Sequence, residues 1–86
     1  MNAVKSAVQE RCVTFAAVVA DAFDGAARML GDAQRFGFIV RVFHLDAADG
    51  SAATIRLTLG IPSDADAAVI RSRLARHETV VSLELC

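Results

Sequence analysis

The chain has 86 residues, of which 55% are hydrophobic and 22% are charged. Nine basic and ten acidic residues leave a formal net charge of −1, which excludes a basic footprint for nucleic acid or an anionic membrane surface. The apolar content excludes intrinsic disorder, and the length predicts one domain near the lower limit for independent folding. Two cysteines, Cys12 and Cys86, form neither a disulfide framework nor a CxxC pair, so we expect no metal or other cofactor.

The N-terminal residues 1–11 are mixed in character and predict a short helix or a loose arm, followed by a single domain over residues 12–86. The most apolar stretch, Cys12–Ala20, is much shorter than the about 20 residues that a transmembrane helix needs. Basic residues precede it, as in a secretory signal, but the acidic Glu10 lies at its boundary and it contains no leucine. We therefore expect a cytoplasmic protein with no membrane partner.

The first regular elements are a strand and a helix. Cys12–Ala20 is apolar or neutral at odd and even positions alike, which is typical of a central strand buried on both faces, although its alanines leave a core helix as the alternative. Asp21 or Asp24 can then cap a helix, Gly37 is well placed to end it, and Gly31 is tolerable where the helix lies close to a sheet. The expected apolar face comprises Phe23, Ala26, Ala27, Leu30 and Ala33, and the opposite polar side carries Arg28, Asp32 and Arg35.

Three strands and one helix follow. Phe38–Leu45 is apolar except at two positions and is predicted to lie nearer the edge of the sheet. A turn containing Asp-Gly leads to Thr54–Leu59, where polar and apolar residues alternate. A second amphipathic helix ends at about Arg76, and Val80–Leu85 is a short final strand. The expected apolar face of the second helix comprises Ala67, Ile70, Leu74 and His77.

This order of elements predicts an α+β fold of the ferredoxin-like βαββαβ type. Two right-handed half-repeats form a four-stranded antiparallel sheet with both helices on one face, and with the first and third strands in the middle. The residues that we expect in one core beneath the helices are Phe15, Ala17, Val19, Leu30, Ile55, Leu57, Leu59 and Ile70.

The sequence shows no catalytic constellation. His44 and His77 are its two histidines, and neither has a cysteine, serine or carboxylate neighbour at a useful spacing. We interpret His44 as an edge-strand residue, His77 as a residue at a helix end, and Asp21 and Asp24 as helix caps. We therefore expect no enzyme activity.

A binding function is more consistent with the start of the first helix. The connection before it ends in Gly25, and a helix N-terminus presents unpaired amides and partial positive charge. A small carboxylate, such as that of an amino acid, suits such a place. We expect its oxygens to meet the amides near Asp24–Ala26, where the charge of the Asp24 carboxylate would oppose them.

Two stretches resemble the ACT domain family, and most of all the small regulatory subunits of acetolactate synthase. Arg28–Leu30 followed by Arg35–Val40 (RFGFIV) is similar to the family's helix that ends in R-x-G-F-x-V. Leu74–Leu83 (LARHETVVSL) is similar to the closing L-x-K-L-x-x-V-x-x-V. The hairpin strand Thr54–Leu59 matches in position, so the resemblance covers about residues 12–85.

The resemblance implies an allosteric regulatory domain or subunit that binds an amino acid between paired copies and acts on a catalytic enzyme subunit, here one of branched-chain amino-acid biosynthesis. The chain lacks the proline of the family's loop, and Ile39 replaces an asparagine whose hydrogen bonds an apolar side chain cannot make. The alternative is therefore an ACT-like structural or dimerisation module that has lost its ligand. The ligand-binding positions carried over from the family are Phe23, Asp24, Gly25, Ala26, Ile39 and Val40.

A homodimer is also expected from the residues themselves. The sheet has a partly apolar face that no helix covers, and large exposed apolar patches are unusual on soluble monomers. The edge strand Phe38–Leu45 is protected only by Arg41 and His44, which favours pairing with its copy across a two-fold axis.

Overall fold

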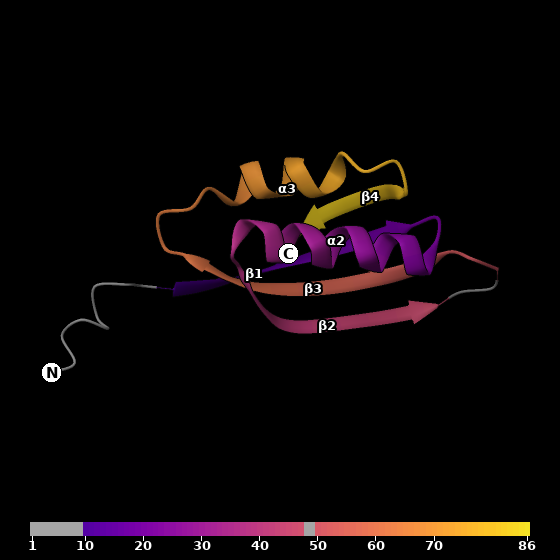
Figure 1. The fold of residues 1–86 in the computed structure, drawn as a ribbon, viewed down its shortest axis with the longest axis horizontal. Coiled ribbons are helices and arrows are strands. Elements are labelled where there is room, and N and C mark those ends of the chain that lie inside the picture. Colours follow the sequence, from indigo (N-terminus) through magenta and orange to yellow (C-terminus); the bar gives the residue numbers. More distant parts are fainter. Residues whose placement is uncertain (1–9, 48–49) are drawn as a thin grey trace, which may run out of the picture.

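The structure is a computed structural model that describes residues 10–47 and 50–86 (Figure 1). The strands form one antiparallel sheet in the order β2-β3-β1-β4, and both helices cover the same face. This confirms the predicted ferredoxin-like fold with the first and third strands in the centre. Most of the expected N-terminal arm lies outside the described residues. The elements are β1 (Glu10–Val19), α2 (Ala22–Phe36), β2 (Ile39–Ala47), β3 (Ala53–Pro62), α3 (Ala67–Ala75) and β4 (Val80–Leu85).

The core lies between the two helices and one face of the sheet. Every second residue is buried from Val13 to Val19 in β1 and from Ala53 to Ile61 in β3, as the period of two in a strand requires. The expected core residues are all buried there except Leu30, which is half-buried and packs against them. Met29 and Leu74, which are fully buried, complete the core from the helices.

The strand β1 is buried on only one face, which corrects the expectation of burial on both. Val18 and Cys12 are exposed because neither α2 nor α3 covers the second face of the sheet, called here the open face. The strand also begins earlier than expected, at Glu10, because its pairing with β3 continues to Pro62. The alternative of a helix over Cys12–Ala20 is wrong.

The helix α2 is capped at both ends as its sequence predicts. The Asp21 carboxylate accepts a hydrogen bond from the Asp24 amide at 2.9 Å, and Gly37 ends the helix in the left-handed region with φ of 79°. The amides of Gly37 and Phe38 then donate to the carbonyls of Gln34 and Ala33.

The buried side of α2 differs from the predicted one. Gly25, Met29, Asp32 and Ala33 are buried, whereas Phe23 is 89% exposed. The helix approaches β1 at Gly25, and positions four and eight residues later therefore face the core. Gly31 does not lie against the sheet, since no atom outside its own helical turn comes within 4 Å of the place that a Cβ would take.

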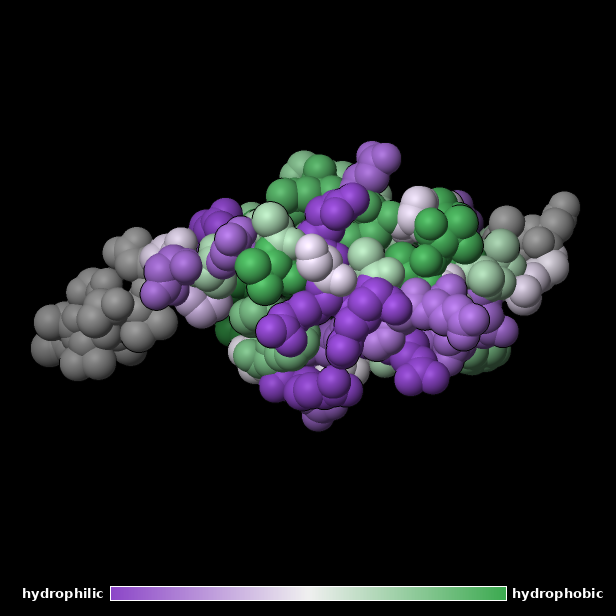
Figure 2. Space-filling view, turned by 90° about the horizontal axis from the view of Figure 1, so that it is seen from above, coloured by the Kyte–Doolittle hydropathy of each residue, from purple (hydrophilic) through white to green (hydrophobic). Residues whose placement is uncertain are grey.

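The second helix agrees with its pattern. α3 begins after Asp66, whose carboxylate accepts from the Ala68 amide at 2.9 Å, and its buried residues are Ile70 and Leu74. Seen from the side of α3 and β4, hydrophilic residues gather over the lower half of the view, and hydrophobic residues lie mostly in its upper half (Figure 2). Neither helix among the described residues is long and apolar enough to cross a membrane.

The edge strand β2 carries an irregularity at Arg41, where the pairing with β3 shifts. Arg41 Nη2 lies 2.6 Å from Glu10 Oε2, so the ion pair spans the open face from β2 to β1 across Gly60 of β3. A Cβ on Gly60 would overlap the Glu10 carboxylate in its present position, so a side chain there would require Glu10 to move. The hydrogen bonds that Arg41 donates to Glu10, together with the negative charge of Glu10, raise the pKa of Arg41 above its ordinary value.

Candidate functional site

The start of α2, which contains four of the expected ligand-binding residues, is exposed at Phe23 and Asp24. The amide of Asp24 donates to the Asp21 carboxylate at 2.9 Å, and the amide of Gly25 donates to the Asp21 carbonyl at 2.8 Å. The amide of Ala22 donates to the Ser51 carbonyl at 2.8 Å. The amides of Asp24 and Gly25 thus have acceptors within the chain, and the expectation that ligand oxygens meet the amides near Asp24–Ala26 stays a prediction.

Gly25 has a packing role that its sequence context does not reveal. A Cβ at this position would lie 2.6 Å from Val19 Cβ and 2.7 Å from both of its methyl carbons. Glycine therefore allows α2 to approach β1 closely. The half-buried Ala26 follows it in the same turn.

The other two expected residues lie at the far end of the helix. Ile39 and Val40 begin β2 and are exposed. At about 1.5 Å per residue, the 15 residues of α2 place them roughly 22 Å from its first turn. One protomer alone does not bring the two halves of the expected site together.

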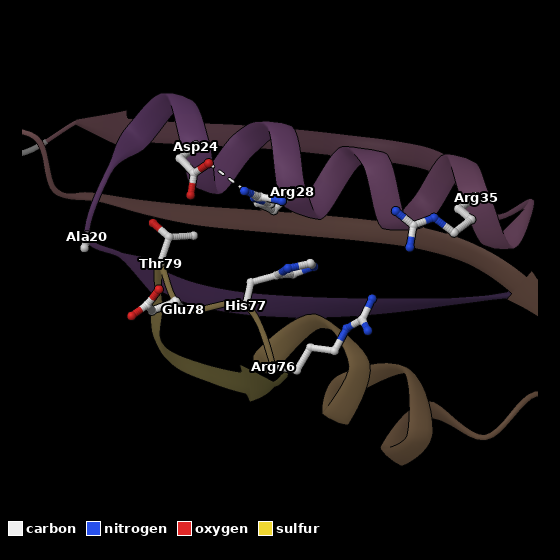
Figure 3. A pocket seen from close by; sticks show the side chains of 8 residues that line it. All are labelled: Ala20, Asp24, Arg28, Arg35, Arg76, His77, Glu78 and Thr79. Atoms are coloured by element: carbon white, nitrogen blue, oxygen red, sulfur yellow. Dashed lines mark hydrogen bonds and ion pairs between the residues drawn. The ribbon is translucent and has the colours of Figure 1, made fainter.

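A groove of about 710 Å³ runs between α2 and the connection from α3 to β4 (Figure 3). Asp24, Arg28 and Arg35 extend into it from α2, and Arg76 and His77 face them from the other side. Ala20, Glu78 and Thr79 complete the lining of this groove.

A buried carboxylate contacts three of the side chains that line the groove. Asp32 is 1% exposed, and its Oδ2 is hydrogen-bonded to His77 Nε2 at 2.7 Å. Its Oδ1 lies 3.8 Å from Arg35 Nη1 and 3.7 Å from Arg76 Nη2. One buried carboxylate thus binds an imidazole through a hydrogen bond and lies within ion-pair distance of two guanidinium groups.

The sequence did not predict this cluster. The sequence pattern predicts Asp32 on the polar side of its helix, which is wrong because Asp32 is buried. His77 directly follows the end of α3, as predicted, but its carboxylate partner is not a neighbour in the sequence. The two residues are 45 positions apart, a distance over which no local pattern acts. One signal was present, because Gly25, Met29 and Asp32 follow each other at helical spacing and share a face with Ala33.

The open face of the sheet has a second hollow of about 570 Å³. His44 and Asp46 of β2, Arg56 of β3 and Glu84 of β4 line it, and exposed polar groups of both signs are therefore mixed there. In the part of the chain that the structure describes, no group of three or more His, Cys, Asp or Glu residues is arranged to hold a metal ion.

Comparisons with known proteins define the fold. No protein-family model and no curated protein sequence matches the chain significantly. The crystal structure of the ACT domain from GTP pyrophosphokinase of Chlorobium tepidum superposes with a TM-score of 0.74 at 17% identity, covering 91% of this chain and 100% of that one. The solution structure of the same domain gives 0.72 at 17% identity over 90% and 86% of the two chains.

The C-terminal domain of the MgtC protein from Mycobacterium tuberculosis is also similar, with a TM-score of 0.70 at 10% identity over 87% of this chain and 84% of that one. At such identities the likeness shows the fold alone. The chain thus has the ACT-like form of the ferredoxin-like fold. The narrower resemblance to acetolactate synthase subunits stays a prediction.

Proposed function

We propose that the chain is a regulatory module of the ACT type, without catalytic activity, that binds a small amino acid between two copies of itself. We further propose that it acts on a catalytic partner, an enzyme of branched-chain amino-acid biosynthesis. The ACT-like fold supports this function, and so does the position of the expected ligand residues in relation to the edge strand.

That position is the observation that carries the proposal. Hydrogen bonds from the Ala22 amide to the Ser51 carbonyl and from Ser51 Oγ to the Ala20 carbonyl tie the start of α2 to the hairpin after β2. If two β2 strands pair antiparallel, the first residues of one strand lie beside the last residues of the other. Ile39 and Val40 of one copy would then approach the start of α2 in its partner.

The side chains at the start of α2 support a ligand there. Phe23 is 89% exposed, so its ring is available for contact with a ligand or a second chain. Asp24 Oδ1 accepts a hydrogen bond from Arg28 Nε at 3.2 Å, whereas its other oxygen, Oδ2, has no partner among the described residues and suits the ammonium group of an amino acid. This reverses the effect expected of Asp24, which would now attract the ligand.

Calorimetric titration with the proteinogenic amino acids, valine, leucine and isoleucine among them, tests the proposal. We expect at least one to bind, and at 100 times its Kd to add about 2.7 kcal/mol to the free energy of unfolding. Asp24→Asn should weaken binding roughly tenfold, since a charge-assisted hydrogen bond is lost. Asp64→Asn is the matched control, because Asp64 is exposed and lies in the connection between β3 and α3.

The second candidate function is an ACT-like structural module that pairs without a ligand. The occupied amides of Asp24 and Gly25 and the apolar Ile39 favour it. A homodimer in sedimentation that gives no heat with any amino acid would establish this alternative and contradict the ligand-binding proposal.

A further inference from the structure

The groove beside α2 brings basic side chains together within one protomer (Figure 3). Arg28 and Arg35 extend from α2, and Arg76 and His77 extend from the end of α3 and the connection after it. These four side chains come from segments more than 40 residues apart in the sequence, and the fold alone assembles them.

The basic groups keep hydrogen-bonding capacity for a ligand. Arg35 and Arg76 approach the same oxygen of Asp32 at 3.8 Å and 3.7 Å, which are too long for direct N–H···O hydrogen bonds. Arg76 Nε donates to the Arg73 carbonyl at 3.1 Å, which holds its side chain in place. A guanidinium group has five N–H donors, so most of those on Arg35 and Arg76 have no acceptor among the described residues.

His77 also keeps one ring nitrogen free for a ligand. Its Nε2 is bonded to Asp32, whereas its Nδ1 makes no hydrogen bond within residues 10–47 and 50–86. Among these residues no buried side-chain nitrogen lacks a partner, so Nδ1 is not fully buried, and His77 lines the groove. Asp32 therefore orients His77 through a hydrogen bond and attracts the exposed Arg35 and Arg76 through its charge.

Acidic residues also line the groove, but at its other end. Figure 3 shows Asp24, Glu78 and Thr79 close to Ala20, while Arg35 lies at the opposite end and Arg76 faces it across the groove. Asp24 pairs with Arg28 at 3.2 Å, which balances that end. At the end formed by Arg35 and Arg76, two positive charges face the single negative charge of Asp32, and the potential is positive.

We propose that Arg35, Arg76 and His77 form a binding site for an oxyanion group, phosphate or carboxylate, of a small metabolite. Planar guanidinium groups match both oxyanions through paired N–H···O bonds. The volume of about 710 Å³ is within the range of small-molecule sites. The site goes beyond the proposed amino-acid site, because it lies within one protomer and uses no residue from the first turn of α2.

The test is a titration of the ¹⁵N-labelled protein with inorganic phosphate and, separately, with acetate, each followed by NMR at an ionic strength kept constant with sodium chloride. We expect saturable shifts of the amides around Arg35 and Arg76 with at least one of the two anions. Arg35→Gln and Arg76→Gln should each weaken this binding roughly tenfold or more. Arg71→Gln is the matched control, because it removes the same charge from an exposed arginine of α3 outside the groove.

Each outcome decides the proposal. Saturation by phosphate or by acetate supports it and tells which oxyanion the site prefers. Shifts that do not saturate, or that Arg71→Gln weakens as much as Arg35→Gln does, show general charge screening and overturn it. Arg35 and Arg76 are exposed, so both variants are expected to keep the dispersed spectrum of the folded protein. If an added amino acid shifts the amide resonance of Phe23, that shift tests the proposed amino-acid site and does not change the result for the oxyanion site.

Discussion

Asp32 is the one charged side chain that folding buries among the described residues, and His77 supplies its short hydrogen bond at 2.7 Å. A buried carboxylate that loses such a partner retains the cost of its desolvation. Arg35 and Arg76 are exposed and lie beyond direct hydrogen-bonding distance of Asp32. If His77 were removed, their charges would therefore compensate the buried carboxylate only in part. The stability of the groove thus depends on one contact between α2 and the connection after α3.

We expect His77→Ala to lower the free energy of unfolding by about 1–3 kcal/mol, since it leaves Asp32 without its hydrogen-bond partner. Urea denaturation measures this change. His44→Ala is the control, because His44 is exposed on β2 and its loss should cost no more than about 0.5 kcal/mol. Equal effects of the two substitutions would show that the contact of His77 with Asp32 adds no stability.

At the scale of elements, glycines in α2 have opposite roles that their sequence does not distinguish. Gly25→Ala would bring a methyl group within 2.6 Å of Val19 and should lower the free energy of unfolding by about 1–3 kcal/mol through overpacking.

Gly31→Ala places its methyl group in open space and should raise the free energy of unfolding by about 0.5–1 kcal/mol. The same urea experiment checks both, and a loss of stability in Gly31→Ala would contradict the packing described here.

The strands were predictable because their information is local. Alternation over Thr54–Leu59 and the apolar run from Cys12 indicate elements and their neighbours without any knowledge of the fold. The buried face of α2 could not be predicted in this way, because the close approach of Gly25 to Val19 decides which residues of the helix face the core. The pair of Asp32 and His77 depends on that face and on tertiary contact, so only the folded chain reveals it.

At the scale of the whole molecule, β2 is an edge strand with an uncovered row of backbone groups. Its side chains offer little protection, because Ile39, Val40 and Val42 are all exposed and apolar. Among the described residues, Arg41, which pairs with Glu10, is the charged side chain in the first half of β2. Such an edge favours antiparallel pairing with a second copy, which would also assemble the proposed amino-acid site.

We therefore expect the protein to sediment as a homodimer of its 9.1 kDa chain, and Val42→Lys to shift it toward the monomer, since the new charge lies in the paired edge. Val69→Lys is the matched control: Val69 is 48% exposed, against 47% for Val42, but it lies on α3, away from β2. Val69→Lys should leave the dimer intact. A wild-type protein that sediments as a monomer at high micromolar concentration would overturn the paired arrangement, and with it any ligand shared between two copies. The oxyanion groove, which one protomer completes by itself, would be unaffected by that result.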